Sequence, residues 1–124
     1  PIRDKFDHPL RYLNLSKNLI ELLPNDFLIN FIQLRVINLS HNKLKMIESN
    51  AFKKLLNLNQ LKLNNNQLEN LDKNLFLDNK ELTELDLSFN SIQILGKLIF
   101  SSTKSLEILN LGKNNLSALD QDLF

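Results

Sequence analysis

The sequence predicts an α/β solenoid, a right-handed coil of short repeats with a parallel β-sheet on its concave face and a mostly irregular convex side. Two observations predict this fold. A 24-residue pattern recurs five times in unbroken register, and its apolar positions alternate over the few residues that a strand would need. The composition agrees, because 30 of the 124 residues are leucine and 19 are asparagine, a bias typical of a repeat protein.

The repeats divide a chain that we expect to form a single domain over residues 1–124. A polar N-terminal lead-in covers residues 1–9. The repeats then cover residues 10–33, 34–57, 58–81, 82–105 and 106–124, the last of them incomplete. A solenoid needs a polar cover at each end, and neither end of this sequence carries an obvious one. We therefore expect a fragment of a longer array, or ends that associate with a partner or with another copy.

Each repeat is numbered here by place, from its first leucine. Places four and six are apolar and point to one side of a short strand, while place five points to the other. One such strand cannot bury its apolar side alone, so neighbouring coils are expected to stack and pair in parallel. Apolar residues at places one, four, six, eleven and fourteen would then fill the interior.

Place nineteen predicts an aromatic ladder on the convex side. Its residues are Phe52, Phe76, Phe100 and Phe124, with Leu28 preceded by Phe27 in the first repeat.

An asparagine stands at place nine of every repeat. These residues are Asn18, Asn42, Asn66, Asn90 and Asn114. Place nine follows the strand, where the chain turns inward and its backbone leaves the sheet. Buried N–H and C=O groups need partners, and an amide supplies both donors and an acceptor. We expect a structural ladder of buried asparagines; a row that lines a binding groove is the weaker alternative.

The pattern resembles LxxLxLxxNxLxxLxxxxFxxLxx, the 24-residue form of the leucine-rich repeat family, over residues 10–124. It is most similar to Toll-like receptor ectodomains, small proteoglycans and secreted leucine-rich immune proteins of insects. The resemblance implies a segment of a horseshoe, and a secreted or extracellular location. Asn79 and Thr103 replace the usual leucine at place twenty-two, which affects local packing rather than the fold.

Composition argues against several other functions. The net charge is only +1, without the clustered basic excess typical of nucleic-acid binding. The absence of cysteine excludes thiolate zinc ligands and a thiol nucleophile, and no cofactor or metal is expected. No apolar run approaches the ~18 residues of a membrane span, so we expect no direct membrane insertion. The N-terminus has no apolar signal core either.

Catalysis needs titratable groups that converge, and the sequence offers no such cluster. The two histidines, His8 and His41, fall in different environments. Ser16, Ser40 and Ser88 occupy place seven, where the repeat itself favours small polar residues. We therefore predict that the protein is not an enzyme.

The variable places on or beside the concave sheet remain for recognition. The candidate partner-binding residues are Arg11, Tyr12, Asn14, Lys17, Arg35, Val36, Asn38, His41, Gln60, Lys62, Glu84, Asp86, Phe89, Glu107 and Ile108. The first two repeats are basic and acids appear from the fourth onward. Tyr12 and Phe89 are the expected aromatic anchors, while Lys62 and Asp86 should be cross-strand neighbours that partly pair. Alternatively, Phe89 packs on neighbouring loops and the charges are simply solvated.

The predicted function is protein–protein recognition, with a protein or peptide ligand bound through the concave face or its edge. By resemblance it would be extracellular and of an innate-immune or cell-surface receptor kind. The alternative is a scaffold segment that self-associates through uncapped ends and binds no ligand of its own. Three sequons mark Asn14, Asn38 and Asn115 as glycosylation candidates, although this composition yields about two by chance.

Overall fold

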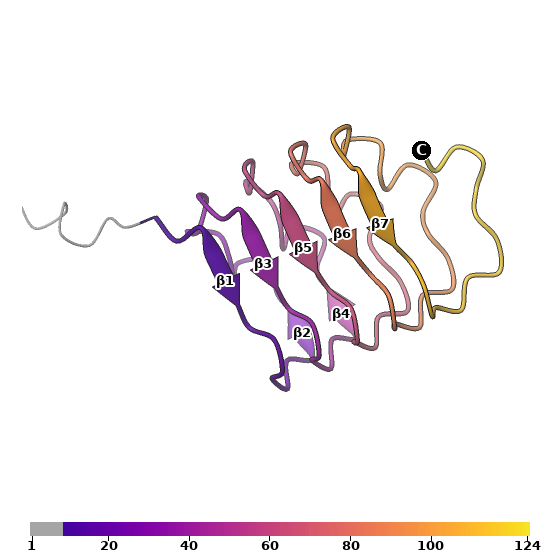
Figure 1. The fold of residues 1–124 in the computed structure, drawn as a ribbon, viewed down its shortest axis with the longest axis horizontal. Coiled ribbons are helices and arrows are strands. Elements are labelled where there is room, and N and C mark those ends of the chain that lie inside the picture. The colour runs from indigo at the N-terminus through magenta and orange to yellow at the C-terminus, as the bar shows by residue number, and fades with distance from the viewer. Residues whose placement is uncertain (1–8) are drawn as a thin grey trace, which may run out of the picture.

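The computed structural model describes residues 9–124 of the chain. Residues 1–8, which hold most of the expected lead-in and His8, lie outside the described residues. From residue 9 onward the chain winds through successive coils that stack side by side along one axis (Figure 1). Each coil corresponds to one repeat.

Five strands, one from each repeat, form a parallel sheet along one side of this stack (Figure 1). They are β1 (Tyr12–Asn14), β3 (Val36–Asn38), β5 (Gln60–Lys62), β6 (Glu84–Asp86) and β7 (Ile108–Asn110). Their order in the sheet is β1-β3-β5-β6-β7, so each coil pairs with the next. Leu13 lies opposite Ile37, and every other pair shows the same 24-residue offset. The parallel sheet and its register are confirmed.

A second, smaller sheet was not expected from the sequence. β2 (Leu22–Leu23) and β4 (Met46–Ile47) pair in parallel at places thirteen and fourteen of the first two coils. Place thirteen is exposed and place fourteen is buried in both, which is the alternation of a short extended segment. The remaining segments form turns and bends, so the mostly irregular side is confirmed. The described residues contain no helix, and therefore none that could cross a bilayer.

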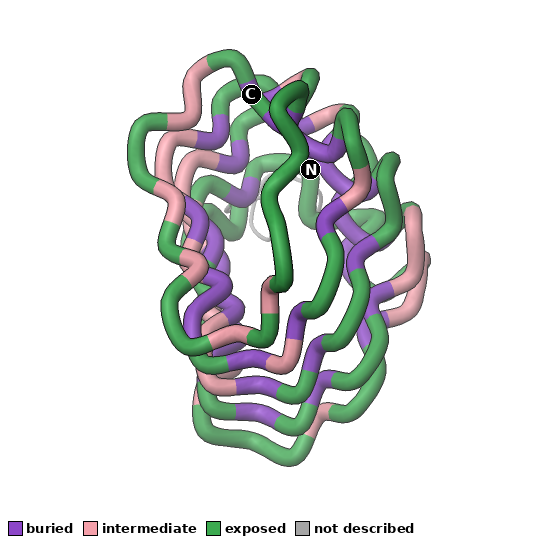
Figure 2. Tube along the Cα trace, turned by 90° about the vertical axis from the view of Figure 1, so that its right-hand side faces the viewer, coloured by how far each residue is buried: buried purple, intermediate pink, exposed green. Residues whose placement is uncertain are grey.

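The hydrophobic core is a column inside the coils. Ile37, Leu61 and Leu85 at place four are fully buried, as are the leucines at place six of the same three coils. In the first and fifth coils these places are only half-buried, because each of those coils has a described neighbour on one side only. Figure 2 looks along the solenoid and shows the buried stretches recurring at the same places from coil to coil.

The phenylalanines at place nineteen stack into a ladder opposite the main sheet. Phe52 and Phe76 lie 6.2 Å apart between ring centroids, Phe76 and Phe100 6.1 Å, and Phe100 and Phe124 5.8 Å, with nearly parallel rings. In the first coil Leu28 is buried, whereas Phe27 is exposed. The inward position there is therefore held by the leucine, and Phe27 takes no part in the core.

The two departures at place twenty-two are buried and hydrogen-bonded. Asn79 Nδ2 donates to the carbonyls of Phe52 and Leu55 in the preceding coil, at 3.1 and 3.2 Å. Its Oδ1 has no hydrogen-bond partner, although the side chain is fully buried. Thr103 Oγ1 donates to the carbonyl of Phe100 at 2.9 Å. These residues replace leucine packing with bonds to the backbone.

The ninth-place asparagines connect backbone groups of two coils. Asn66 Nδ2 donates to Leu63 and Asn64 carbonyls in its own coil, at 3.1 and 3.4 Å, and to the Leu39 carbonyl of the preceding coil at 3.0 Å. Asn66 Oδ1 accepts the backbone N–H of Leu44, also in the preceding coil, at 3.0 Å. The same set of bonds recurs at Asn42, Asn90 and Asn114.

The expectation that all five asparagines are buried was wrong at the ends of the array. Asn18 is exposed, and its Nδ2 donates only to the Leu15 and Ser16 carbonyls of its own coil, at 2.9 and 3.2 Å. Asn114 is half-buried. The reason is geometric, because burial of place nine depends on a coil packed on each side.

Candidate functional site

The candidate surface is the outer face of the five-stranded sheet, called here the concave face. Its side chains are those at places three and five of each repeat, because the side chain at place four points into the core. Place two lies just before each strand. Place eight lies beyond the strand ends and is called the rim. Every sequence-predicted partner-binding residue belongs to place two, three or five or to the rim.

At place three, the two ends of the sheet are apolar and open. Tyr12 and Ile108 are each 56% exposed, on β1 and β7. Val36, Gln60 and Glu84 lie between them and are half-buried by their neighbours. The concave face therefore carries a large apolar side chain at each end and a more polar centre.

At place five, four of the five side chains hydrogen-bond to the backbone of their own coil. Residues with such structural roles, together with the core and the ninth-place asparagines, are called here the frame. Asn14, Asn38, Asp86 and Asn110 each accept, through Oδ1, the backbone N–H two residues later, at 3.0 Å. The first three also accept a serine hydroxyl at 2.6 Å. This arrangement is an Asx turn, and it turns the backbone out of the sheet after these four strands. Sequence reasoning missed this role, although the motif Asn/Asp-Leu-Ser occurs at places five to seven of three repeats.

Lys62 is the exception at place five. It is exposed, and Asn64 at its place seven bonds to Asn65 instead. Lys62 lies opposite Asp86 in the sheet register. The described residues contain one ion pair, Lys97 with Asp122, so the expected pairing of Lys62 with Asp86 was wrong. The Asp86 carboxylate is turned toward its own Asx turn.

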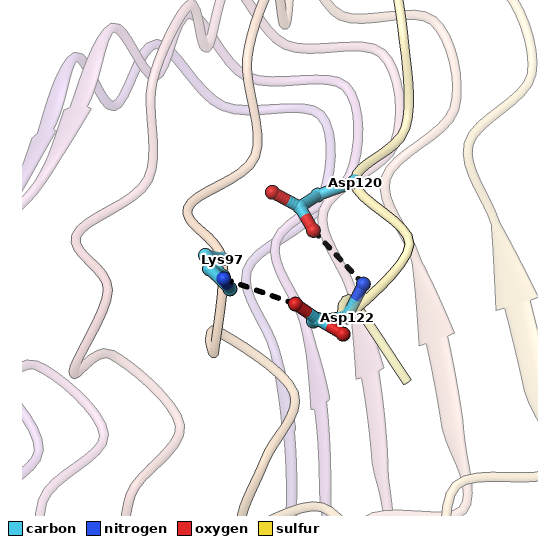
Figure 3. A network of polar contacts seen from close by, with 3 residues as sticks. All are labelled: Lys97, Asp120 and Asp122. Atoms are coloured by element: carbon cyan, nitrogen blue, oxygen red, sulfur yellow. Dashed lines mark hydrogen bonds and ion pairs between the residues drawn. The ribbon is translucent and has the colours of Figure 1, made fainter.

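The ion pair that does form lies away from the strands. Lys97 Nζ and Asp122 Oδ2 are 2.9 Å apart, and the Asp122 N–H donates to Asp120 Oδ1 at 2.8 Å (Figure 3). Both charged side chains are 62% exposed, so the pair adds little stability.

The rim has an unusual backbone. Lys17, His41, Asn65, Phe89 and Lys113 all have a positive φ, between 54° and 57°. This left-handed conformation suits asparagine or glycine and is costly for a bulky residue. Phe89 adopts it while 53% exposed, so the alternative in which Phe89 packs on neighbouring loops is not supported. Sequence reasoning missed the conformation because the four residue types at these five positions share no preference for it.

Place two completes the pattern. Arg11 and Arg35 are exposed in the first two coils, and Glu107 is exposed in the fifth. Between them, Asn59 Nδ2 donates to the Glu81 carbonyl and Thr83 Oγ1 to the Asn59 carbonyl, at 3.3 and 3.1 Å. The middle of this column is therefore bound to the frame, and its charged members stand at the two ends.

The glycosylation candidates occupy two environments. Asn14 and Asn38 stand on the strands, and their Oδ1 atoms are held in Asx turns. Asn115 is exposed at place ten, beside the rim, with only its backbone N–H bound to the coil before it. Glycosylation of all three stays a prediction.

No catalytic arrangement is present among residues 9–124. This range contains no group of three or more histidine, aspartate or glutamate side chains able to hold a metal ion. His41 is the one histidine within this range, and it lies on the rim. A hollow of about 830 Å³ lies on the flank near β4, with Lys45, Glu69 and Asp72 in its wall. It is away from the concave face and contains no nucleophile paired with a base.

The coils stack on one another, each gives one short strand to a parallel sheet, and asparagine side chains hydrogen-bond neighbouring coils together. This arrangement defines a solenoid repeat protein. The family described as leucine-rich repeat matches residues 32–92, 80–124 and 9–30. The chain therefore belongs to the leucine-rich repeat family, whose members are typically not enzymes. No curated protein matches the chain in a sequence search.

Two of the solved structures that are similar to this chain are receptor complexes. One is a TLR13–ssRNA13 complex, with a TM-score of 0.82 and 33% identity over 86% of this chain. The other is the glycosylated Toll–Spatzle complex, described as a hub in Drosophila development and innate immunity, with a TM-score of 0.80 and 30% identity over 90% of this chain. The chain spans only 15% of the length of each. The family resemblance to Toll-like receptor ectodomains is confirmed.

Proposed function

We propose that this chain is a protein-recognition segment of an extracellular leucine-rich repeat protein, of an innate-immune or cell-surface receptor kind. Its partner binds across the concave face and the rim. One observation carries the proposal, namely that Phe89 on the rim is 53% exposed although its coil has a described neighbour on each side. Tyr12 and Ile108 add exposed apolar side chains on the two end strands. Exposed aromatic residues on a rigid surface are typical anchors of protein interfaces.

The structural roles of the other repeat positions limit which concave and rim side chains a partner could use. In the inner coils the leucines and phenylalanines of the consensus places fill the core, the ninth-place asparagines bind backbone, and four place-five side chains close turns. The sheet spans about 19 Å across its five strands, at ~4.8 Å per strand. This width suits a peptide or one face of a small protein.

The similar structures favour the same class of function. One of them holds Toll with Spatzle, which is a protein ligand. The other holds TLR13 with a single-stranded RNA, so nucleic acid is the competing ligand class. For this chain the net charge of +1 favours protein. The extracellular location is inferred from these neighbours and from the resemblance.

The proposal is tested with the cognate partner and single alanine variants of Tyr12, Lys62 and Phe89. Loss of a buried interface anchor is expected to weaken binding by about 2 kcal/mol, or roughly thirtyfold. Leu77→Ala is the matched control, because Leu77 is an exposed apolar residue outside the concave face and rim. Unchanged affinity in all three variants would move the binding site off this face. Light scattering over a concentration series separates ligand binding from end-to-end assembly.

A further inference from the structure

The charged side chains of the concave surface are sorted by sign along the solenoid axis. Arg11 and Arg35 are exposed at place two of the first two coils, and Lys62 is exposed in the third. Glu84 follows half-buried on β6, and Glu107 is exposed beside β7. One end of the surface is therefore basic and the other acidic. Asp86, half-buried on β6, follows the same order, and Lys113 on the rim of the fifth coil is the exception to it.

Among residues 9–124, none of these charged side chains takes part in an ion pair. The ion pair of the described residues, Lys97 with Asp122, lies at places sixteen and seventeen, away from the strands. The nearest arginine and glutamate of the two ends, Arg35 and Glu84, are two strand spacings apart, which is about 10 Å. That separation exceeds the Debye length of ~8 Å at physiological salt, so the two ends interact weakly with each other. Each end keeps its charge available to a partner.

The basic end places two exposed arginines on adjacent coils. The Arg35 backbone N–H donates to the Arg11 carbonyl at 2.8 Å, so the two residues stand side by side just before β1 and β3. Like charges placed side by side on a sheet repel each other, and a bound anion would relieve that repulsion. Guanidinium groups bind carboxylates through paired hydrogen bonds. Tyr12, next in sequence and 56% exposed, adds an apolar surface beside them.

We propose that the concave surface binds a polypeptide segment of opposite polarity. Its carboxylates lie over Arg11 and Arg35, and its basic side chains lie over Glu84 and Glu107. This inference rests on the proposed function, which makes this surface the recognition site. A uniform polyanion is disfavoured, because it would meet carboxylates on the fourth and fifth coils.

Two neutral peptides of identical composition test the polarity. The block peptide has three glutamates, a Gly-Ser-Gly spacer and three lysines, while the scrambled peptide alternates the same glutamates and lysines. Both have blocked ends and a fluorescent label for anisotropy. At low salt the block peptide is expected to bind on the order of fivefold more tightly, because only it matches both ends of the surface. The difference should shrink at 0.15 M salt, where screening is stronger.

Charge-reversed variants locate the effect. Arg11→Glu with Arg35→Glu should remove the preference for the block peptide. Lys53→Glu with Lys73→Glu is the matched control, because it makes the same charge change at exposed positions away from the sheet. Arg11→Gln with Arg35→Gln serves if the reversed pair lowers stability, which thermal unfolding reports.

Orientation gives a second, independent readout. The chain has no cysteine, and the peptide can carry a single spin-labelled cysteine at either end. A label at the glutamate end should broaden the NMR signals of β1 and β3, and a label at the lysine end those of β7. Combining the arginine reversals with Glu84→Lys and Glu107→Lys should invert this pattern.

Three results would overturn the inference: equal affinity for the two peptides, no fixed orientation, or tighter binding of poly-glutamate or of a single-stranded oligonucleotide than of the block peptide. The proposed function fails separately, through the alanine variants tested against the cognate partner. A partner that needs Tyr12 and Phe89, together with peptides that bind equally, would leave the recognition surface intact and refute its polarity.

Discussion

Replacing Asn66 with alanine tests the asparagine ladder at its centre. The change removes the only hydrogen-bond acceptor found for the Leu44 N–H, in a residue that is fully buried. Leaving a buried donor unsatisfied costs about 1–3 kcal/mol. The three carbonyls that Asn66 contacts keep another donor each, from Asn42, Asn90 or the His41 N–H, so their loss adds less. We expect Asn66→Ala to lower the free energy of unfolding by about 2–4 kcal/mol.

The assay is urea unfolding followed by two probes. Far-UV circular dichroism reports the sheet, and the fluorescence of Tyr12 reports the first coil, because the chain has one tyrosine and no tryptophan. Coincident transitions establish that the array unfolds as one unit, which repeat proteins do not always do. Amide exchange adds a local readout, since the Leu44 N–H should lose protection before its neighbours do.

The matched control is Asn18→Ala, at the same place in the first coil. Asn18 is exposed and bonds only within its own coil, so we expect a loss under about 1 kcal/mol. Asn66→Asp separates the two halves of the amide, since it keeps an acceptor for Leu44 and sets a carboxylate against carbonyl oxygens. It should cost at least as much as the alanine. An Asn66→Ala variant no less stable than Asn18→Ala would refute the reasoning.

Three further changes probe the other parts of the frame by thermal or urea unfolding. Phe76→Ala should cost about 3–5 kcal/mol, because Phe76 is fully buried between two stacked rings, and a loss below that of the 80% exposed Phe124→Ala would contradict the ladder. Phe89→Asn should raise stability by about 1 kcal/mol, because asparagine tolerates the left-handed backbone better; destabilisation would show that no strain is stored there. Lys62→Asn should gain about 0.5–1.5 kcal/mol by accepting the Asn64 N–H as the other coils do, and a lower unfolding midpoint would exclude that turn.

The sequence was sufficient for the frame because the frame is periodic. A leucine at places four and six can satisfy its burial only if the next coil repeats it, so the 24-residue lag dictated strands, pairing and register together. The same logic located the phenylalanine ladder. It failed at Asn18, since burial of place nine depends on a neighbouring coil rather than on the residue itself.

The candidate site was less predictable from the sequence, because the same short motif can serve either recognition or modification or the closing of a turn. The sequence marks Asn14-Leu15-Ser16 as a sequon, and the structure holds the same three residues in an Asx turn. The left-handed rim follows from how each strand leaves the sheet, so it accepts lysine, histidine or phenylalanine alike. The Lys62–Asp86 pair was wrong for a related reason, as the turn already orients the carboxylate.

Only some places of the repeat can vary without a loss of stability, and these places are the ones available for binding a partner. Place five contributes to turn closure in four coils, so changing it for a new ligand would cost stability. Places two and three and the rim carry no such duty at Arg11, Tyr12, Phe89 and Ile108. Phe89 is the most informative of these, because an exposed aromatic ring in a left-handed conformation stabilises neither the core nor the turn. We therefore expect Phe89→Asn to raise stability and weaken partner binding together, a combination that a purely structural phenylalanine would not give.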